Sequence, residues 1–434
     1  MRKNREKKDL MLEAELSEEK LNIPEDEIWT YRIDGLQTPR IVDKSVKART
    51  KFAIIAVLVV AIALSVFFSI YALINEEFDC KQTSDGWEFI KYSNPGQVTE
   101  VNVDFAFGDK SKPITEIHEY AFNCDEKIET INIGKDVRKI DGKSFYSCWN
   151  LENVFVDDDN PYYCDIDGVL YNKELTEIIY YPSAHNLYLT RQAGYKLDFP
   201  EDGSITNDDF CSAVNMLDKC VSEGKTPEKL EGDEKTLFEK FNTLTGKADW
   251  KKFVGDYNQK VGIYVLPSTV TEIGKLAFAY SDITEIYLPA GLKSIGTLGF
   301  FKAEKLKEIY SYTCTDTVAG TDWNAAAALS SVCRSLPDTL EFIGSDAFTY
   351  DRGITYMYIP SSVREIGHHA FFNMAYKSGD EIEGLAKMNV QQDEALFSSE
   401  TKIGDSWLPK LDAGLFKKNI EVVYSSERET ASLK

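Results

Sequence analysis

The sequence predicts a β-rich solenoid with helical insertions, preceded by one transmembrane α-helix. Two observations lead to this prediction: six short, similar repeats in the C-terminal part of the chain, and one uncharged apolar run near the N-terminus. At 434 residues, the chain is long enough to bury a large core without relying on cross-links.

The apolar run covers residues 52–74 and contains no charged side chain. A helix of about 20 apolar residues, at roughly 1.5 Å each, matches the hydrocarbon thickness of a bilayer. A cleavable signal peptide would have a shorter apolar core close to the start of the chain. We therefore expect a single-pass membrane anchor.

The charges that flank this run predict its orientation. Residues 40–51 contain five Lys and Arg but only one acidic residue, Asp43, whereas Glu76, Glu77 and Asp79 follow the run. Because basic residues favour the cytoplasmic side, we expect the N-terminus in the cytoplasm and the C-terminal domain outside the cell membrane. Residues 1–51 are rich in charge and are expected to be largely disordered.

The repeats share an Ile, a short polar stretch, a small residue and a Phe. Neighbouring copies start 22 or 23 residues apart where nothing interrupts them, as from Ile273 to Ile295. The six copies are Ile117–Phe122, Ile140–Phe145, Ile273–Phe278, Ile295–Phe300, Ile343–Phe348 and Ile366–Phe371. A period in this range is typical of a solenoid.

Each repeat also contains a stretch in which apolar residues alternate with others, as in residues 285–288. This two-residue alternation predicts a half-buried strand, and Pro289 or Pro360 then ends it because proline cannot donate to a ladder. A unit of about 23 residues cannot bury its own apolar face, so stacked units must share one core.

The pattern resembles the BspA-like leucine-rich repeats of bacterial surface proteins. The resemblance covers roughly residues 98–185 and 261–373, and it includes the Asp159–Tyr163 segment beside the repeats. It implies a leucine-rich repeat fold, display on a cell surface, and adhesion or binding of host components. It provides no catalytic residues to carry over.

Two segments interrupt the repeats. Residues 186–260 show apolar stripes at helical spacing, one of which follows Asn207 and stops at Gly224. A shorter insertion at 311–336 contains a stretch, 322–332, that we expect to be helical. The chain is thus divided into a tail 1–51, a membrane helix 52–74, a juxtamembrane cap 75–97, repeats 98–185, a helical insertion 186–260, repeats 261–373, and a C-terminal cap and tail 374–434.

All eight cysteines follow the membrane segment, which is compatible with an oxidising compartment. Cys314 and Cys333 bracket the shorter insertion, and we predict a disulfide between them. Cys211 and Cys220 lie nine residues apart on a predicted helix, beyond disulfide reach. Cys124 and Cys148 follow the Phe of two successive repeats. They are close enough to bond, although the resemblance favours buried thiols there.

The candidate binding surface is aromatic. Outward positions of the predicted strands hold Phe155, Tyr287, Tyr310 and Tyr358. Stacked strands would align these rings on one exposed face, which suits contact with a ligand. The alternative is that the aromatics only support each other within the sheet.

The composition and the motifs argue against several classes of protein. Lys plus Arg number 49 against 71 Asp plus Glu, so a net charge of −22 disfavours nucleic acid as a partner. No catalytic motif, cofactor motif or metal-ligand spacing is visible, so an enzyme is not expected. We predict a cell-surface adhesion module that recognises a protein or glycan on a host or neighbouring cell; alternatively, the chain is a structural or signalling subunit of a membrane assembly.

Overall fold

The computed structural model describes residues 78–93, 98–122, 127–200, 202–313, 329, 331–378, 381–392, 401–404 and 421–425. The chain divides into two compact units, residues 1–71 and 72–434, and every described residue belongs to the second unit. Within the described ranges, no helix is long and apolar enough to cross a membrane. The predicted tail 1–51 and membrane helix 52–74 lie outside these ranges.

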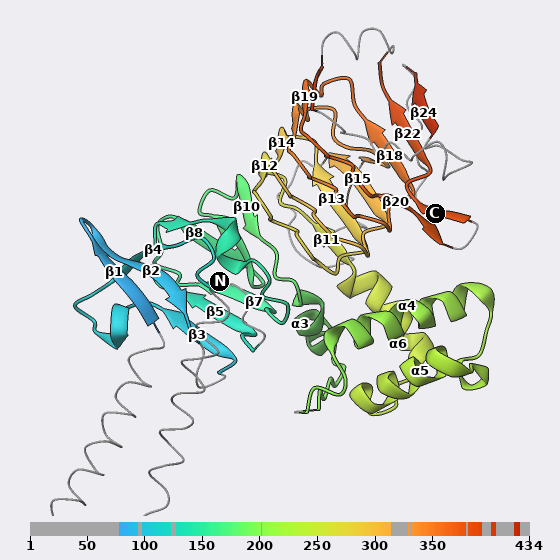
Figure 1. Cartoon of the computed structure of the whole chain (residues 1–434), viewed down its shortest axis with the longest axis horizontal. Coiled ribbons are helices and arrows are strands. Elements are labelled where there is room, and N and C mark those ends of the chain that lie inside the picture. The colour runs from blue at the N-terminus through green and yellow to red at the C-terminus, as the bar shows by residue number, and fades with distance from the viewer. Residues whose placement is uncertain are drawn as a thin grey trace, which may run out of the picture. The chain divides into compact units, whose positions relative to one another are not determined.

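The first repeat block is built from two sheets (Figure 1). The longer strands of its rungs pair in parallel in one sheet, with Val101, Ile131 and Val154 in register. The first sheet contains β3 (Glu100–Val103), β5 (Thr130–Ile133) and β7 (Asn153–Val156); the second contains β1 (Phe78–Thr83), β2 (Gly86–Tyr92), β4 (Ile114–Ile117) and β6 (Lys139–Ile140). The antiparallel pair β1–β2 caps the block, because β2 continues in parallel to β4.

The second block repeats this plan with more rungs. Its short strands join one eight-stranded sheet, in which Ile273, Ile295, Ile343 and Ile366 occupy equivalent positions. That sheet contains β8 (Tyr163–Ile166), β9 (Val169–Asn172), β10 (Glu177–Tyr180), β12 (Glu272–Ile273), β14 (Ser294–Ile295), β17 (Phe342–Ile343), β19 (Glu365–Ile366) and β23 (Lys402–Ile403).

The longer strands of the second block form two further sheets. One contains β11 (Ile263–Val265), β13 (Glu285–Pro289), β15 (Glu308–Thr313) and β16 (Ser331–Cys333); the other contains β18 (Tyr356–Ile359), β22 (Lys387–Val390) and β24 (Glu421–Tyr424). The hairpin β20 (Ala375–Ser378) and β21 (Glu381–Gly384) lies between two rungs. Stacking therefore continues beyond residue 373, where we placed the end of the repeats. The repeat pattern did not predict this continuation, because the hairpin interrupts the regular spacing.

The Phe of each repeat stacks on the Phe of the next rung. In the second block Phe278, Phe300, Phe348 and Phe371 form a continuous stack with ring centroids 5.0, 5.0 and 5.4 Å apart. All four rings are fully buried. The small residue before each Phe lets these rings approach, and the shared stack explains why the repeats cannot fold singly.

The Gly that follows the repeat Ile allows close approach between rungs. A Cβ on Gly344 would lie 2.5 Å from the backbone carbon of Gly296, and one on Gly367 would lie 2.3 Å from the Ser345 nitrogen. Contacts this short are not tolerated, so a side chain at either position would push neighbouring rungs apart.

Two consecutive tyrosines connect the blocks. Tyr180 stacks on Phe145 of the first block at 4.8 Å, and Tyr181 stacks on Phe278 of the second at 5.4 Å. Strand β10 also pairs in parallel with β12, 95 residues further along the chain. The solenoid thus continues across the insertion, which leaves the stack after β10 and returns before β11.

The insertion is helical and has its own core. It comprises α3 (His185–Gln192), α4 (Asn207–Glu223), α5 (Gly232–Thr245) and α6 (Trp250–Asp256), followed by a π-helical turn, η4 (Tyr257–Val261). Thr206 and Asp209 form a reciprocal capping box at the start of α4, and Gly224, with φ of 64°, caps its end. Short 3-10 turns lie at η1 (Ala106–Gly108), η2 (Gly142–Phe145) and η3 (Pro227–Lys229).

The shorter insertion differs from our expectation. Its C-terminal end is strand β16, which pairs antiparallel with β15, so Val332 is not helical. Cross-strand pairing with Tyr312 prevails over the local helical pattern there. Residues 314–328 lie outside the described ranges.

Candidate interaction surface

The four aromatic residues predicted to form one exposed ladder lie in three different sheets. Tyr287 and Tyr310 are in register on β13 and β15, and their rings stack 5.0 Å apart. Phe155 lies on β7 and Tyr358 on β18. The alignment therefore exists between neighbouring strands but does not extend over the molecule.

The prediction that these rings are exposed is wrong for two of them. Only 5% of Tyr287 and 1% of Tyr358 is accessible, while Phe155 and Tyr310 are half-buried. Tyr287 packs in a cluster with Tyr312 and Leu329, which come from the shorter insertion and its flanking strand. Helix α3 places Tyr188 edge-on against Phe155 at 6.4 Å. The insertions cover β7 and β13 at these rings, which the spacing of repeats could not reveal.

The structure describes only one cysteine of the predicted disulfide. Cys333 is a free thiol and lies opposite Ser311, three residues before Cys314 in the chain. Cys314 lies outside the described ranges. Cys211 and Cys220 are both free thiols on α4.

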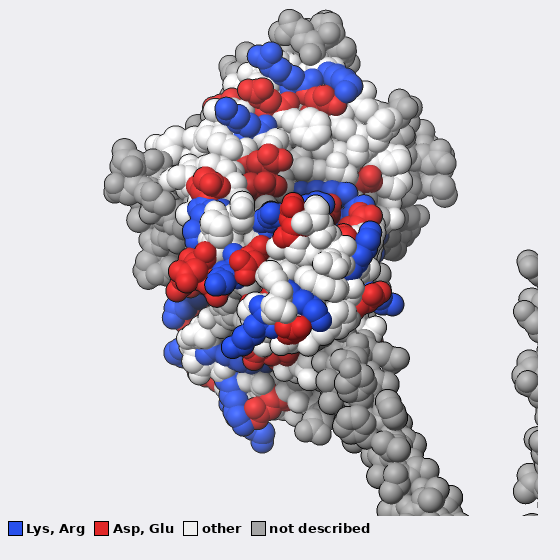
Figure 2. All heavy atoms as spheres, turned by 90° about the vertical axis from the view of Figure 1, so that its left-hand side faces the viewer, with Lys and Arg blue, Asp and Glu red and all other residues white. Residues whose placement is uncertain are grey.

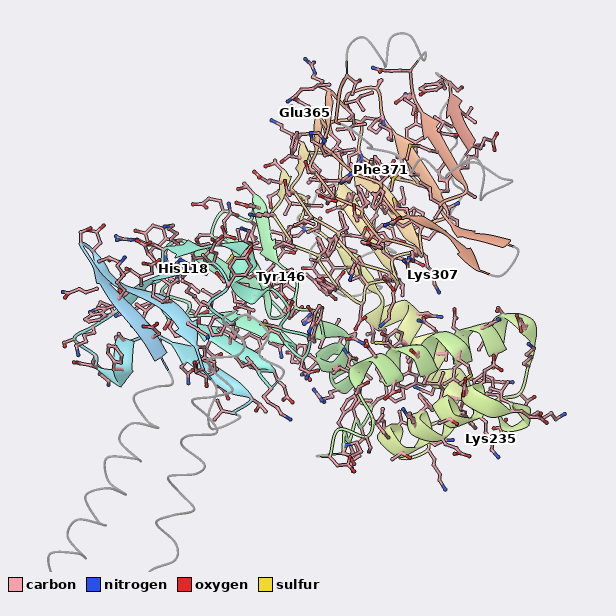
Figure 3. The ribbon with its side chains drawn as sticks, in the orientation of Figure 1. His118, Tyr146, Lys235, Lys307, Glu365 and Phe371 are labelled. Atoms are coloured by element: carbon pink, nitrogen blue, oxygen red, sulfur yellow. The ribbon has the colours of Figure 1, made fainter. Side chains whose placement is uncertain are left out.

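A different set of rings forms a continuous surface line along the turns around the Ala-Phe step. We call this set the aromatic row: Tyr120, Tyr146, Trp149, Tyr280, Phe301 and Tyr350. Tyr146 contacts Tyr120 at 6.1 Å and Tyr280 at 6.2 Å between ring centroids, so the row crosses from the first block to the second. Phe301 continues it to Tyr350 at 6.0 Å. Tyr146 is marked in Figure 3.

The row lies at the surface. Tyr120 is 41% and Trp149 39% accessible, and the other four rings are half-buried. Most of the ring pairs meet edge to face, as Trp149 and Tyr280 do at 4.3 Å and 85°. A contiguous exposed aromatic patch of this kind is typical of a binding surface.

The backbone fixes the rings in place. Tyr120, Tyr280 and Tyr350 have φ of 63°, 62° and 69°, in the left-handed region that costs residues other than Gly about 1–3 kcal/mol each. Hydrogen bonds between rungs hold this conformation, since the Tyr280 N–H donates to the Phe301 carbonyl at 2.9 Å and the Tyr350 N–H to the Phe372 carbonyl at 3.0 Å.

Cations lie against the row. The Lys302 ammonium is 5.4–5.7 Å from the centroids of Tyr280, Phe301 and Tyr350, and the Lys143 ammonium is 5.2 Å from that of Tyr120. Such cation–π contacts hold the ammonium groups beside the rings. Burial, followed by the contact with Tyr146, raises the pKa of Tyr280, so its hydroxyl stays neutral at physiological pH.

Two lysines meet where the blocks join. Lys143 forms an ion pair with Glu119 at 2.9 Å, which raises the pKa of this lysine and lowers that of the glutamate. Lys275 comes from the second block, and burial together with Lys143 lowers its pKa. The Glu119 carboxylate also acts on Lys275, as does Asp141, so acidic groups of this chain lie near both lysines.

The sequence contains a signal for the row that the strand-based prediction missed. One or two residues after the repeat Phe, five of the copies carry another aromatic: Tyr146, Tyr280, Phe301, Tyr350 and Phe372. We expected outward-facing rings on the alternating strands alone, because a strand presents every second side chain to one face. The turn after the Phe has no such alternation, so its exposed rings went unnoticed.

Metal binding has no support in the described ranges, where no group of three His, Cys, Asp or Glu is placed to hold an ion. The acidic residues around Asp157 bind backbone N–H groups: Asp157 accepts from the Asp159 amide at 2.9 Å, and Asp165 from the Val156 amide at 2.8 Å. These carboxylates cap turns.

The fold and the row define a repeat protein with an extended aromatic surface. Residues 104–187, 257–378 and 324–405 match six copies of the BspA type leucine-rich repeat region, and the matched ranges cover more than half of the chain. The chain belongs to the BspA-type leucine-rich repeat family.

Solved structures of leucine-rich repeat proteins are also similar. A Eubacterium ventriosum protein shares 17% identity over 70% of this chain with a TM-score of 0.36, and the present chain spans only 56% of its length. The pneumococcal vaccine antigen PcpA shares 15% identity over 75% of this chain and 67% of its own, with a TM-score of 0.34. A leucine-rich repeat protein from T. pallidum shares 12% identity over 80% of this chain and 97% of its own, with a TM-score of 0.29. No curated protein matches the chain.

Proposed function

We propose that this protein is a membrane-anchored binding module that recognises a protein or glycan on a host or neighbouring cell through the aromatic row. The row is the observation that carries the proposal, because six surface rings touch one another across both repeat blocks. The rigid solenoid holds them without a ligand, which lowers the entropy cost of binding.

The anchor and the orientation are part of this proposal. The uncharged run 52–74 and the basic residues before it support a cytoplasmic N-terminus and an extracellular repeat domain. Protease added to intact cells should release fragments of the repeat domain while leaving the N-terminal tail protected. Cleavage of the repeat domain only after the cells are opened would contradict this placement.

Binding is tested with the full chain in mild detergent, applied to an array of immobilised extracellular matrix proteins and host glycans. We expect a bound component whose affinity falls about tenfold in Tyr280→Ser, since a central aromatic contact contributes more than 1 kcal/mol. Tyr162→Ser is the matched control, because Tyr162 is 48% accessible and lies outside the row. Equal losses in the two variants, or an array without any bound component, would refute the role of the row.

A further inference from the structure

The charges along the row indicate what kind of ligand it takes. Neither Lys275 nor Lys302 has a carboxylate within 4 Å among the residues that the structure describes, although most lysine contacts elsewhere are ion pairs. Lys302 is held by three rings instead. Lys302 is therefore positioned but not neutralised, whereas Lys275 lies near Glu119 and Asp141 without a direct ion pair. The Lys302 ammonium can pair with an anionic group of a ligand.

The negative net charge does not prevent this. On the face shown in Figure 2, basic and acidic side chains are interspersed, so the charge of −22 does not form one acidic field there. At physiological salt, charges more than about 8 Å apart are largely screened. The local charge therefore decides the interaction with a bound group, and beside Tyr280, Phe301 and Tyr350 that charge is the Lys302 ammonium.

The backbone behind the row argues against a peptide strand. Peptides that add to a sheet need unpaired backbone N–H and C=O groups. Here these groups already bond from rung to rung, as from Leu276 to Thr297 at 3.2 Å, Phe278 to Gly299 at 2.7 Å and Tyr280 to Phe301 at 2.9 Å. The row offers ring surfaces and ammonium groups at intervals set by the repeats.

We propose that the row binds an acidic polysaccharide, with a carboxylate or sulfate of the glycan paired to Lys302 beside Tyr280, Phe301 and Tyr350. The C–H faces of the sugar rings lie on Tyr146, Tyr280 and Phe301, whose π-faces carry partial negative charge. A further anionic group reaches Lys275 at the junction of the blocks. A repetitive ligand suits this site, because the aromatic and basic groups recur along the rungs. This inference rests on the proposed function and specifies its ligand.

The test uses the full chain in mild detergent and four soluble probes: polygalacturonate, heparin, neutral dextran and poly-glutamate. We expect binding of polygalacturonate or heparin, and the preferred one distinguishes carboxylate from sulfate recognition. Affinity should fall at least tenfold from 0.05 to 0.5 M NaCl, as charge pairs are screened. Dextran and poly-glutamate should not bind measurably.

Two double variants with the same loss of charge locate the site. Lys275→Gln with Lys302→Gln should weaken acidic glycan binding at least tenfold, because two charge-assisted contacts are lost. Lys235→Gln with Lys293→Gln should change it less than twofold, since Lys235 lies on α5 of the insertion (Figure 3) and Lys293 is an exposed residue directly before β14 that contacts no ring of the row. Circular dichroism of both variants checks that they fold.

Three outcomes would overturn the inference: no acidic glycan binds, poly-glutamate binds as tightly as the glycan, or the control pair weakens binding as much as the row pair. If a neutral glycan or a matrix protein binds instead, and Tyr280→Ser still weakens it, the proposed function stands and only the acidic glycan is rejected. If Tyr280→Ser has no effect on any probe, both fail.

Discussion

The repeat blocks and the helical insertion are stabilised in different ways. In the blocks, strands of two to seven residues have no local core, and each rung is completed by the Phe and Ile of its neighbours. In the insertion, α4, α5 and α6 enclose Phe210, Phe241 and Phe253 in a cluster of their own. Stability is thus shared along the blocks and local in the insertion.

A polar cluster holds the insertion against the second block. Lys305 pairs with Asp282, both on the repeat side, and Asp282 also accepts from the Cys211 thiol of α4 at 3.3 Å and from Asn207 at 3.4 Å. Burial raises the pKa of Cys211 to about 12, so it remains a neutral thiol donor. The repeat blocks and the insertion thus have separate hydrophobic cores, and specific polar contacts join them.

The largest expected effect comes from the Phe stack. Phe300→Ala should lower the free energy of unfolding by about 3–5 kcal/mol, because a fully buried ring between two others is lost. Hydrogen exchange should accelerate in the rungs on both sides. Phe241→Ala is the matched change in the insertion, and its faster exchange should stay within α4–α6. Identical exchange patterns for the two variants would remove the distinction between shared and local stability.

A smaller effect is expected at the polar cluster. Lys305→Met leaves Asp282 with an uncompensated charge in a mostly buried site, and we expect a loss of about 2–3 kcal/mol in urea unfolding. The double variant Lys305→Met with Asp282→Leu should recover most of this loss, since no buried charge remains. A double variant as unstable as the single one would show that the ion pair itself supplies the docking energy.

Acid should weaken the junction between the first block and the insertion. His185 is fully buried, its Nδ1–H donates to the Glu152 carbonyl at 2.7 Å, and burial lowers its pKa to about 4. Because the unfolded chain binds a proton near pH 6.5, stability is complete above that pH and is lost as pH falls towards 4. From pH 7 to pH 5 the loss is roughly 2 kcal/mol.

His185→Gln separates this contribution from that of the neighbouring Glu152–Arg191 pair, which both proteins retain. Burial raises the pKa of Glu152, so its protonation acts in the opposite direction. Urea unfolding at several pH values should show a steeper fall in the unsubstituted protein than in the variant. Parallel profiles would mean that His185 does not titrate on unfolding.

The smallest effect is expected at the cap of α4. Thr206→Ala removes the hydroxyl that accepts from the Asp209 N–H and should cost about 1 kcal/mol. The loss should appear in the exchange of α4 and leave the rungs unaffected. Thr236→Ala on α5 is the control, because Thr236 lies within a helix and supplies no cap.

Much of the fold could be predicted from residue patterns. The Ile-Gly and Ala-Phe pairs repeat because every rung meets the same environment, so the solenoid is visible without coordinates. The α4 stripe and its stop at Gly224 are similarly local, since a cap and a left-handed Gly depend on neighbouring residues alone. The C-terminal end of the solenoid was harder to predict from the sequence, because the β20–β21 hairpin separates Ile366 from its paired residue Ile403.

The candidate surface depended on contacts between distant segments. Alternation places Tyr287 and Tyr358 on the outward side of their strands, but it does not show that other parts of the chain bury them. The aromatic row likewise joins Tyr146 to Tyr280, which are separated by the whole insertion. The sequence by itself determined the repeat unit, because that unit follows from short-range periodicity. Only the tertiary structure decided which aromatic rings reach the surface, because burial depends on which remote segments pack against a strand.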